Sequence, residues 1–195
     1  MHGVRFIIGL SVISALCASA ATAVALHFLK TETPGPTKET LIANSYAVAA
    51  AQNMDPRTLR RNLDAGNETS ALVDLRSPQE YADEHIVSAL NIPVFSDPHT
   101  STLNETERII AAFQVLAAQN PSKDIIVYAH NGPSLTTEMV GALLAEQGIL
   151  VKQLTIGWNE WRYYWTLWNH KDEWTGIGSE DYLWRGNEPG VPERR

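Results

Sequence analysis

Cysteine is nearly absent from this chain, which has one, Cys17, among 195 residues. A single cysteine excludes an intrachain disulfide, so packing has to hold the fold together. No set of cysteine and histidine residues has the spacing of metal ligands, and we expect neither a bound metal nor a cofactor. Because Cys17 lies in an apolar segment near the N-terminus, we also expect no cysteine chemistry in the folded domain.

Excess positive charge is missing as well. The formal net charge is -7, and the basic residues are scattered apart from two short pairs, Arg60-Arg61 and Arg194-Arg195. A protein that works on nucleic acid needs a concentrated basic face, so we expect no nucleic-acid partner. The length of 195 residues and the hydrophobic share of 44% suit one globular domain plus an extra segment.

The extra segment is an uncharged apolar run from Phe6 to Leu29. At about 1.5 Å per residue it is long enough to cross roughly 30 Å of hydrocarbon. Residues 1–30 are therefore predicted to be a signal anchor that makes this a single-pass membrane protein with an extracytoplasmic domain. A signal peptide cleaved near Ala20 is the alternative, because small residues surround that position, and the domain would then be secreted. A proline-rich linker, residues 31–38, follows.

Beyond the linker, strand-like and helix-like segments alternate. Strands are predicted at residues 71–75, 91–94, 124–128 and 150–154. Helices are predicted at residues 56–63, from 78 onward, at 105–119 and at 136–146, the first two after the caps Asp55-Pro56 and Ser77-Pro78. This alternation predicts an α/β domain, residues 39–185, with a parallel β-sheet flanked by helices. Residues 186–195, rich in glycine and proline, are predicted to be a loose tail.

Two separated stretches carry a family resemblance. The first runs from Leu72-Val73-Asp74-Leu75-Arg76 to Pro93, and the second joins Ile126-Val127-Tyr128 to Gly157-Trp158 and Trp161. On these motifs, between residues 55 and 162, the chain resembles the rhodanese superfamily. The resemblance implies a rhodanese-like fold and a site in the loop after Tyr128. Rhodanese-like enzymes place there a cysteine that carries a sulfane sulfur as a persulfide.

The loop after Tyr128 departs from that pattern. It comprises Ala129, His130, Asn131, Gly132, Pro133 and Ser134. Ala129 stands at the family's cysteine position and Ser134 at its arginine position, while Gly132 matches the family's glycine. Pro133 lacks an N–H group that an anion-binding loop would use. An alanine cannot form a covalent intermediate, so we predict a binding loop without a catalytic residue.

Other polar residues of the resemblance have structural interpretations. Asp74 and Arg76 are predicted to support the loop, with Arg76 and Glu80, spaced i and i+4, forming a surface or loop-anchoring ion pair. His85 is expected to make a structural hydrogen bond at the end of a helix. His130 is interpreted as an ordinary loop histidine, or alternatively as a ligand of an anion held by the remaining N–H groups.

Tryptophan is concentrated near the C-terminus. Trp158, Trp161, Trp165 and Trp168 share one stripe of a helix predicted after Gly157. Such a helix is expected to pack across the sheet, with the segment up to Trp184 beside it. The alternative is an aromatic surface for a protein partner or for the membrane interface, extended by Trp174 and Trp184.

The functional prediction that follows is a membrane-tethered, catalytically degenerate rhodanese-like domain that binds a protein partner or a small anion. Two alternatives stay open. One is a sulfurtransferase or a phosphatase-like enzyme whose nucleophile is non-standard or supplied from outside. The other is a structural spacer within a membrane protein complex.

Overall fold

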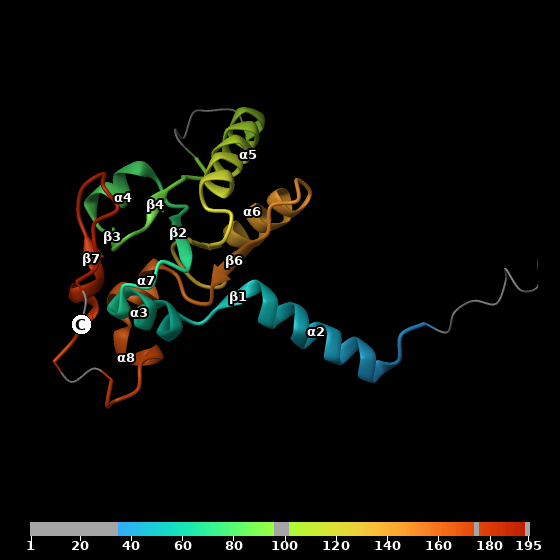
Figure 1. The fold of residues 1–195 in the computed structure, drawn as a ribbon, viewed down its shortest axis with the longest axis horizontal. Coiled ribbons are helices and arrows are strands. Elements are labelled where there is room, and N and C mark those ends of the chain that lie inside the picture. The colour runs from blue at the N-terminus through green and yellow to red at the C-terminus, as the bar shows by residue number, and fades with distance from the viewer. Residues whose placement is uncertain (1–34, 96–101, 174–175, 194–195) are drawn as a thin grey trace, which may run out of the picture. The chain divides into compact units, whose positions relative to one another are not determined.

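The structure of the protein, a computed structural model, describes residues 35–95, 102–173 and 176–193 (Figure 1). The chain divides into two units, Met1–Ser45 and Tyr46–Arg195. The predicted membrane segment, Phe6–Leu29, lies outside the described residues, as does Trp174. Within the described ranges, every helix is too short or too polar to cross a membrane.

A five-stranded sheet forms the centre of the second unit (Figure 1). All of its pairs are parallel, in the order β1-β6-β5-β2-β4. The strands are β1 (Asn53–Met54), β2 (Ser70–Asp74), β4 (Leu90–Asn91), β5 (Asp124–Tyr128) and β6 (Val151–Leu154). In register, Asp74 pairs with Tyr128, so both strands end at the same edge. The predicted α/β fold with a parallel sheet is therefore confirmed.

Helices cover both faces of the sheet because successive side chains of a strand point to opposite sides. In β5, Ile126 belongs to one apolar cluster, and its neighbours Ile125 and Val127 belong to another. The first cluster packs under α3 (Pro56–Ala65), α4 (Pro78–Asp83), α7 (Trp158–Tyr163) and α8 (Trp165–Trp168). The second packs under α5 (Thr102–Gln119) and α6 (Leu135–Ala145).

The predicted helix caps form as expected. Asp55 accepts a hydrogen bond from the Thr58 N–H, and Gly66 ends α3 with a left-handed φ of 63°. Ser77 begins α4 with a capping box, in which the Ser77 hydroxyl accepts from the Glu80 N–H and the Glu80 carboxylate accepts from the Ser77 N–H. These short-range signals fix where each helix starts relative to the sheet edge.

The single tryptophan-bearing helix predicted after Gly157 is wrong. The chain forms two short helices, α7 and α8, because Tyr164 leaves helical geometry with φ -122° and ψ 39°. The break brings the Trp165 and Trp168 rings against Trp161, and Trp165 also stacks on Tyr182 at 5.4 Å between ring centroids. Burial of these rings outweighs continuation of the helix.

The C-terminal segment is also more ordered than predicted. After the 3-10 helix η1 (Ser179–Tyr182), strand β7 (Leu183–Trp184) pairs antiparallel with β3 (His85–Ile86). The Gly186 N–H then donates to the Ala82 carbonyl at 2.8 Å, and the Ser88 N–H donates to the Pro189 carbonyl at 2.5 Å. Residues 186–190 are therefore held against α4 and β3, and the predicted loose tail does not begin at residue 186.

Candidate functional site

The loop between β5 and α6, residues 129–134, begins with a buried methyl group. Ala129 is 3% exposed and belongs to the apolar cluster under α5 and α6. Its carbonyl accepts a hydrogen bond from the Trp158 N–H at 2.8 Å, and the His130 carbonyl accepts one from the Asn159 N–H at 2.8 Å. The first turn of α7 therefore closes over the start of this loop.

Two glycines let this loop touch the turn that precedes α7. A Cβ added at Gly132 would lie 2.3 Å from the carbonyl carbon of Ile156, and one added at Gly157 would lie 2.4 Å from backbone atoms of Asn131. Both distances are far below van der Waals contact, so only glycine fits at either position. Gly132, predicted from the resemblance to be part of the loop, thus has a packing role here.

Ser134 is the N-cap of α6. Its hydroxyl accepts from the Thr137 N–H at 3.2 Å, and its own N–H donates to the Thr137 hydroxyl at 3.3 Å. The Thr137 hydroxyl lies 3.0 Å from Gln153 Oε1 on β6. Ser134, which the resemblance predicts to stand at an arginine position, therefore caps the N-terminus of its own helix, a common use of serine.

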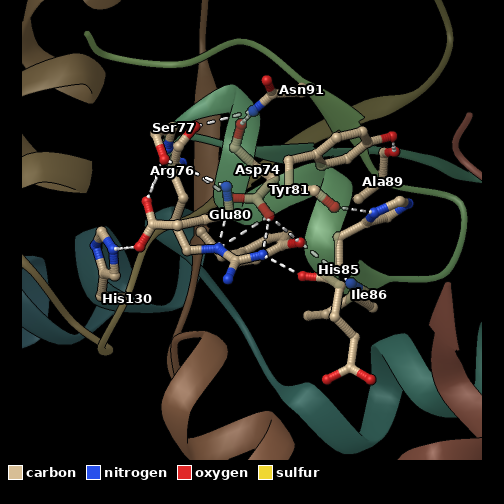
Figure 2. Close-up of polar contacts among 12 residues, drawn as sticks. Asp74, Arg76, Ser77, Glu80, Tyr81, His85, Ile86, Ala89, Asn91 and His130 are labelled. Atoms are coloured by element: carbon tan, nitrogen blue, oxygen red, sulfur yellow. Dashed lines mark hydrogen bonds and ion pairs between the residues drawn. The ribbon is translucent and has the colours of Figure 1, made fainter. Parts of the chain in front are cut away.

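A buried ion pair lies at the neighbouring strand end (Figure 2). The Arg76 guanidinium donates through Nε and Nη2 to the Asp74 carboxylate, with Nη2 2.6 Å from Oδ2, and Nη2 also donates to the Glu84 carbonyl. The Tyr128 hydroxyl donates to Asp74 Oδ2 at 2.7 Å. Asp74 is fully buried and Arg76 is 4% exposed. That Asp74 and Arg76 support the loop after β5 stays a prediction.

Electrostatics within this network favours the ion pair. Burial disfavours the charged guanidinium, but hydrogen bonds and charge attraction from Asp74 outweigh it and raise the pKa of Arg76. Burial raises the pKa of Tyr128 well above its ordinary value, and the Asp74 charge adds to this effect. Tyr128 therefore stays a neutral hydrogen-bond donor, and the Trp158 ring covers the guanidinium at 4.2 Å.

The predicted ion pair between Arg76 and Glu80 does not form. Glu80 Oε2 instead accepts from the Ser77 N–H and hydroxyl, and Glu80 Oε1 lies 2.6 Å from His130 Nε2 (Figure 2). Arg76 turns inward because Asp74, buried at the end of β2, needs a cation more than the exposed Glu80 does. Burial raises the pKa of Glu80, but hydrogen bonds from Ser77 and His130 outweigh it and lower the pKa overall.

His85 has the structural role that was predicted. Its ring is fully buried and stacked on Tyr81, with centroids 3.7 Å apart. Nδ1 lies 2.7 Å from the Tyr81 carbonyl oxygen, so Nδ1 carries the proton that is donated. Burial lowers the pKa of His85 below its ordinary value. The imidazole is thus a neutral part of the core under the end of α4.

An open hollow of about 360 Å³ lies beside His130. Its lining includes three carboxylates, Glu80, Asp83 and Glu84, and two arginines, Arg76 and Arg185. Most of these charges are paired within the protein, since Glu84 binds Arg162 and Arg185. The predicted alternative of an anion held by His130 would have to compete with Glu80 at 2.6 Å.

The predicted tryptophan surface is largely interior. Trp158, Trp161 and Trp165 are buried, and Trp168 is half-buried with its Nε1 donating to the Glu160 carbonyl. The exposed large hydrophobic side chains of α7, α8 and the residue between them are Tyr163, Tyr164 and Leu167. The indoles therefore hold the helices to the core, as the packing interpretation expected. A contact with a partner would use the neighbouring exposed side chains.

Several residues of the site escaped the sequence analysis. Tyr128 and Glu84 complete the Asp74–Arg76 network, and Asn159 donates to Asn131 Oδ1 across the loop at 2.8 Å. Their partners lie far away in sequence, so no local pattern marks them. Among the residues that the structure describes, no group of three histidine, cysteine or acidic residues could hold a metal ion.

Comparison with solved structures gives remote similarity. The BH2092 protein from Bacillus halodurans is 22% identical over 64% of this chain and 80% of its own, with a TM-score of 0.47. The Alr3790 protein from Anabaena sp. is 24% identical over 55% and 73%, with a TM-score of 0.40. A rhodanese with anions from E. coli is 21% identical over 45% and 86%, with a TM-score of 0.31. Among curated proteins, none matches the chain.

A family comparison is more decisive. Residues 55–163 match the family described as the rhodanese-like domain. The matched range begins at the cap of α3, ends with α7, and contains all of the buried network around Asp74 and Arg76. The chain therefore belongs to the rhodanese-like domain family.

Proposed function

We propose that this protein is a membrane-tethered, extracytoplasmic rhodanese-like domain that has no sulfurtransferase activity and acts by binding a protein partner. The observation that carries the proposal is the buried methyl group of Ala129 at the end of β5. Persulfide transfer needs a thiolate at the site, and the chain's one sulfhydryl, Cys17, belongs to the uncharged run Phe6–Leu29.

Features of the loop add support. Pro133 has no N–H group, and the Ser134 N–H already donates to the Thr137 hydroxyl. These two positions would otherwise contribute donors to an anion cradle at the start of α6. Nucleophile, cation and two of the donors are therefore missing from the place where the family's chemistry takes place.

Charge favours a protein partner over a small anion. In the hollow beside His130, Arg76 is paired with Asp74 and Arg185 with Glu84, so both guanidinium groups already have a carboxylate partner that an anion would have to displace. An exposed aromatic group adjoins the same region, since Tyr163 lines the hollow and is 65% exposed. Tyrosine at a rim can bury a large area on a partner while its hydroxyl stays hydrogen-bonded.

Membrane tethering rests on the length and lack of charge of residues 6–29. Flotation of the full chain with lipid vesicles would test it, with a variant carrying Leu16→Arg and Val24→Arg as the control that should not float. Protease added to sealed cells or spheroplasts would test the side: residues beyond the linker should be cleaved from outside. Protection of the domain until the membrane is broken would contradict the extracytoplasmic placement.

The catalytic alternative is tested by a thiosulfate:cyanide sulfurtransferase assay on the full chain in detergent, beside its Cys17→Ser variant. We expect thiocyanate at the rate of the protein-free blank from both, and no mass increase of one sulfur atom on either. Turnover that vanishes with Cys17→Ser would show that Cys17 reaches a substrate. Turnover retained in the cysteine-free variant would point to a non-standard nucleophile, and either result would overturn the proposal.

The partner is tested by a photo-crosslinking amino acid placed at Tyr163 or Leu167 in cells. Val115, an exposed apolar residue on α5, is the control position. We expect one discrete adduct from α7 and α8 and none from α5. The same adducts from all three positions, or none from any, would argue instead for a spacer without a specific partner.

A further inference from the structure

Helix α6, which follows the loop of the candidate site, exposes large apolar side chains. Leu135 is 71% exposed, and Met139, one turn later, is 63% exposed. Adjacent apolar side chains that stay exposed are typical of an interaction surface. The buried apolar residues of α6 belong to the second apolar cluster, on the face of the sheet opposite to α7 and α8. This surface is therefore separate from Tyr163 and Leu167, which the proposed function uses.

Small residues of α6 lie beside this pair and form a groove. Residues four apart form rows along a helix, and a ridge on one helix packs into a groove on another. Leu135 and Met139 form such a ridge, while Gly141, Ala142 and Ala145 line a groove of about 500 Å³, the α6 groove. Every residue that lines this groove lies in the second unit of the chain. With its 11 residues, α6 is about 16 Å long, which is enough for three turns of another helix.

Two carboxylates stand at the ends of this surface. Glu138 and Glu146 lie one turn before and one turn after Ala142, and both are exposed. Eight residues of helix separate them, which is about 12 Å. In the part of the chain that the structure describes, neither of them pairs with a cation. From residue 124 to residue 151 the sequence has no lysine or arginine, so the surface of α6 is both apolar and acidic.

Charge narrows the choice of what covers α6. A helix that lies on a membrane surface carries lysine and arginine, and anionic lipid headgroups would repel Glu138 and Glu146. A symmetric pair of copies through α6 would bring the carboxylates of one copy near those of the other. The apolar run Phe6–Leu29 of the same chain has no positive charge to offer them. A different protein with basic residues is the occupant that complements this surface.

We propose that α6 binds an amphipathic helix of a partner protein, in which an aliphatic side chain has a lysine or arginine one turn before it and another one turn after it. The aliphatic side chain packs on Ala142 in the α6 groove, against the ridge of Leu135 and Met139. The two cations pair with Glu138 and Glu146. This binding goes beyond the proposed function, because it requires neither the membrane tether nor the absence of catalysis.

Designed peptides test this surface on the full chain in phosphatidylcholine nanodiscs, whose lipid has no net charge. Three dye-labelled, alanine-based helices of about 18 residues share their leucines. They differ at the positions four before and four after the central leucine, where both residues are lysine, glutamine or glutamate. Fluorescence anisotropy measures Kd. Because each exposed ion pair contributes little, we expect the lysine peptide to bind about tenfold more tightly than the glutamate peptide.

Exchanging the charges on the protein sharpens this test. Glu138→Lys with Glu146→Lys should reverse the order of the peptides. The matched control, Asp172→Lys with Glu68→Lys, changes the net charge equally at exposed positions outside α6 and should keep the order. Equal binding of all three peptides, no binding of the lysine peptide, or an order that does not reverse would overturn the proposal.

A further variant tests the apolar contact. Ala142→Gln puts a polar side chain where the leucine should pack, and it should weaken binding of the lysine peptide about tenfold. Val115→Gln, at an exposed position on α5, should leave the affinity unchanged, and equal effects of the two variants would contradict the contact. A photo-crosslinking amino acid at Met139 identifies other occupants. Adducts between two copies of the chain, or with residues 1–37 of the same chain, would overturn the assignment to a partner protein.

Discussion

The segment from β2 to α4 and the loop from β5 to α6 end at the same edge of the sheet but use their polar positions differently. In the first, Asp74 and Arg76 are buried, paired and joined to Tyr128. In the second, Ala129 is a buried methyl and Ser134 binds its own helix. The comparison teaches that this fold depends on the first region. The second can lose reactive groups while its backbone contacts remain.

The contrast has an energetic basis. A buried charge without its partner is costly, so the ion pair between Asp74 and Arg76 must be kept or replaced as a whole. A loop residue that carries a thiol can become alanine without leaving any unpaired group. Gly132 of the loop and Gly157 before α7 have a different role, because the two backbones touch there.

The largest expected effect comes from breaking the buried pair. Arg76→Ala leaves the Asp74 carboxylate unpaired at 0% exposure, which should lower the free energy of unfolding by about 3–5 kcal/mol. Lys152→Ala is the control, since it breaks the exposed pair with Asp124 and should cost no more than about 1 kcal/mol. Urea denaturation followed by tryptophan fluorescence measures both. Similar midpoints for the two variants would contradict the comparison.

A smaller decrease in the free energy of unfolding is expected when a side chain is added inside the loop between β5 and α6. Gly132→Ala places a Cβ 2.3 Å from the Ile156 backbone, and overpacking of this kind costs about 1–3 kcal/mol. Gly178→Ala, where nothing lies within 4 Å, is the matched control and should stay near the wild-type value. Thermal unfolding would compare them. A stable Gly132→Ala protein would show that the loop is looser than its contacts with the α7 turn imply.

A pH effect should report the buried His85. Its pKa is lowered by burial from the ordinary value of 6.5, so the unfolded chain binds more protons between the two values. The contribution of His85 to the free energy of unfolding is complete above pH 6.5, and it decreases as the pH falls through the folded-state pKa. His85→Phe should flatten the stability curve between pH 7 and 5 relative to the wild-type chain. An unaltered slope in His85→Phe would mean that a group other than His85 takes up the proton on unfolding.

The smallest effect is expected on sulfurtransferase activity, from substitutions in the loop between β5 and α6. Ala129→Cys, in a chain lacking Cys17, should give almost no sulfurtransferase activity, because the buried thiol has no cation beside it. Ser134→Arg in addition should raise activity further, although losing the Ser134 cap costs about 1 kcal/mol. The thiosulfate:cyanide assay measures both. Full activity from Ala129→Cys alone would show that the loop still holds a working cradle.

Much of the fold could be predicted from the sequence because its signals are local. The caps Asp55 and Ser77 and the stop at Gly66 act within one helical turn. The apolar run of β5 is long enough to mark a buried parallel strand. The predictions failed where burial decides the contact: Arg76 pairs with the buried Asp74 rather than with Glu80. The helix after Gly157 breaks at Tyr164, and the Trp165 ring packs on the distant Tyr182.

The sequence by itself determined the alternation of strands and helices, and it determined that alanine, Ala129, follows β5. Only the tertiary structure decided that Gly132 touches Ile156 and that Glu80 meets His130. The physical reason is that the two kinds of feature depend on different parts of the chain. Caps and strand periodicity depend on neighbours a few residues away, whereas the partner of a charge depends on which groups folding removes from water.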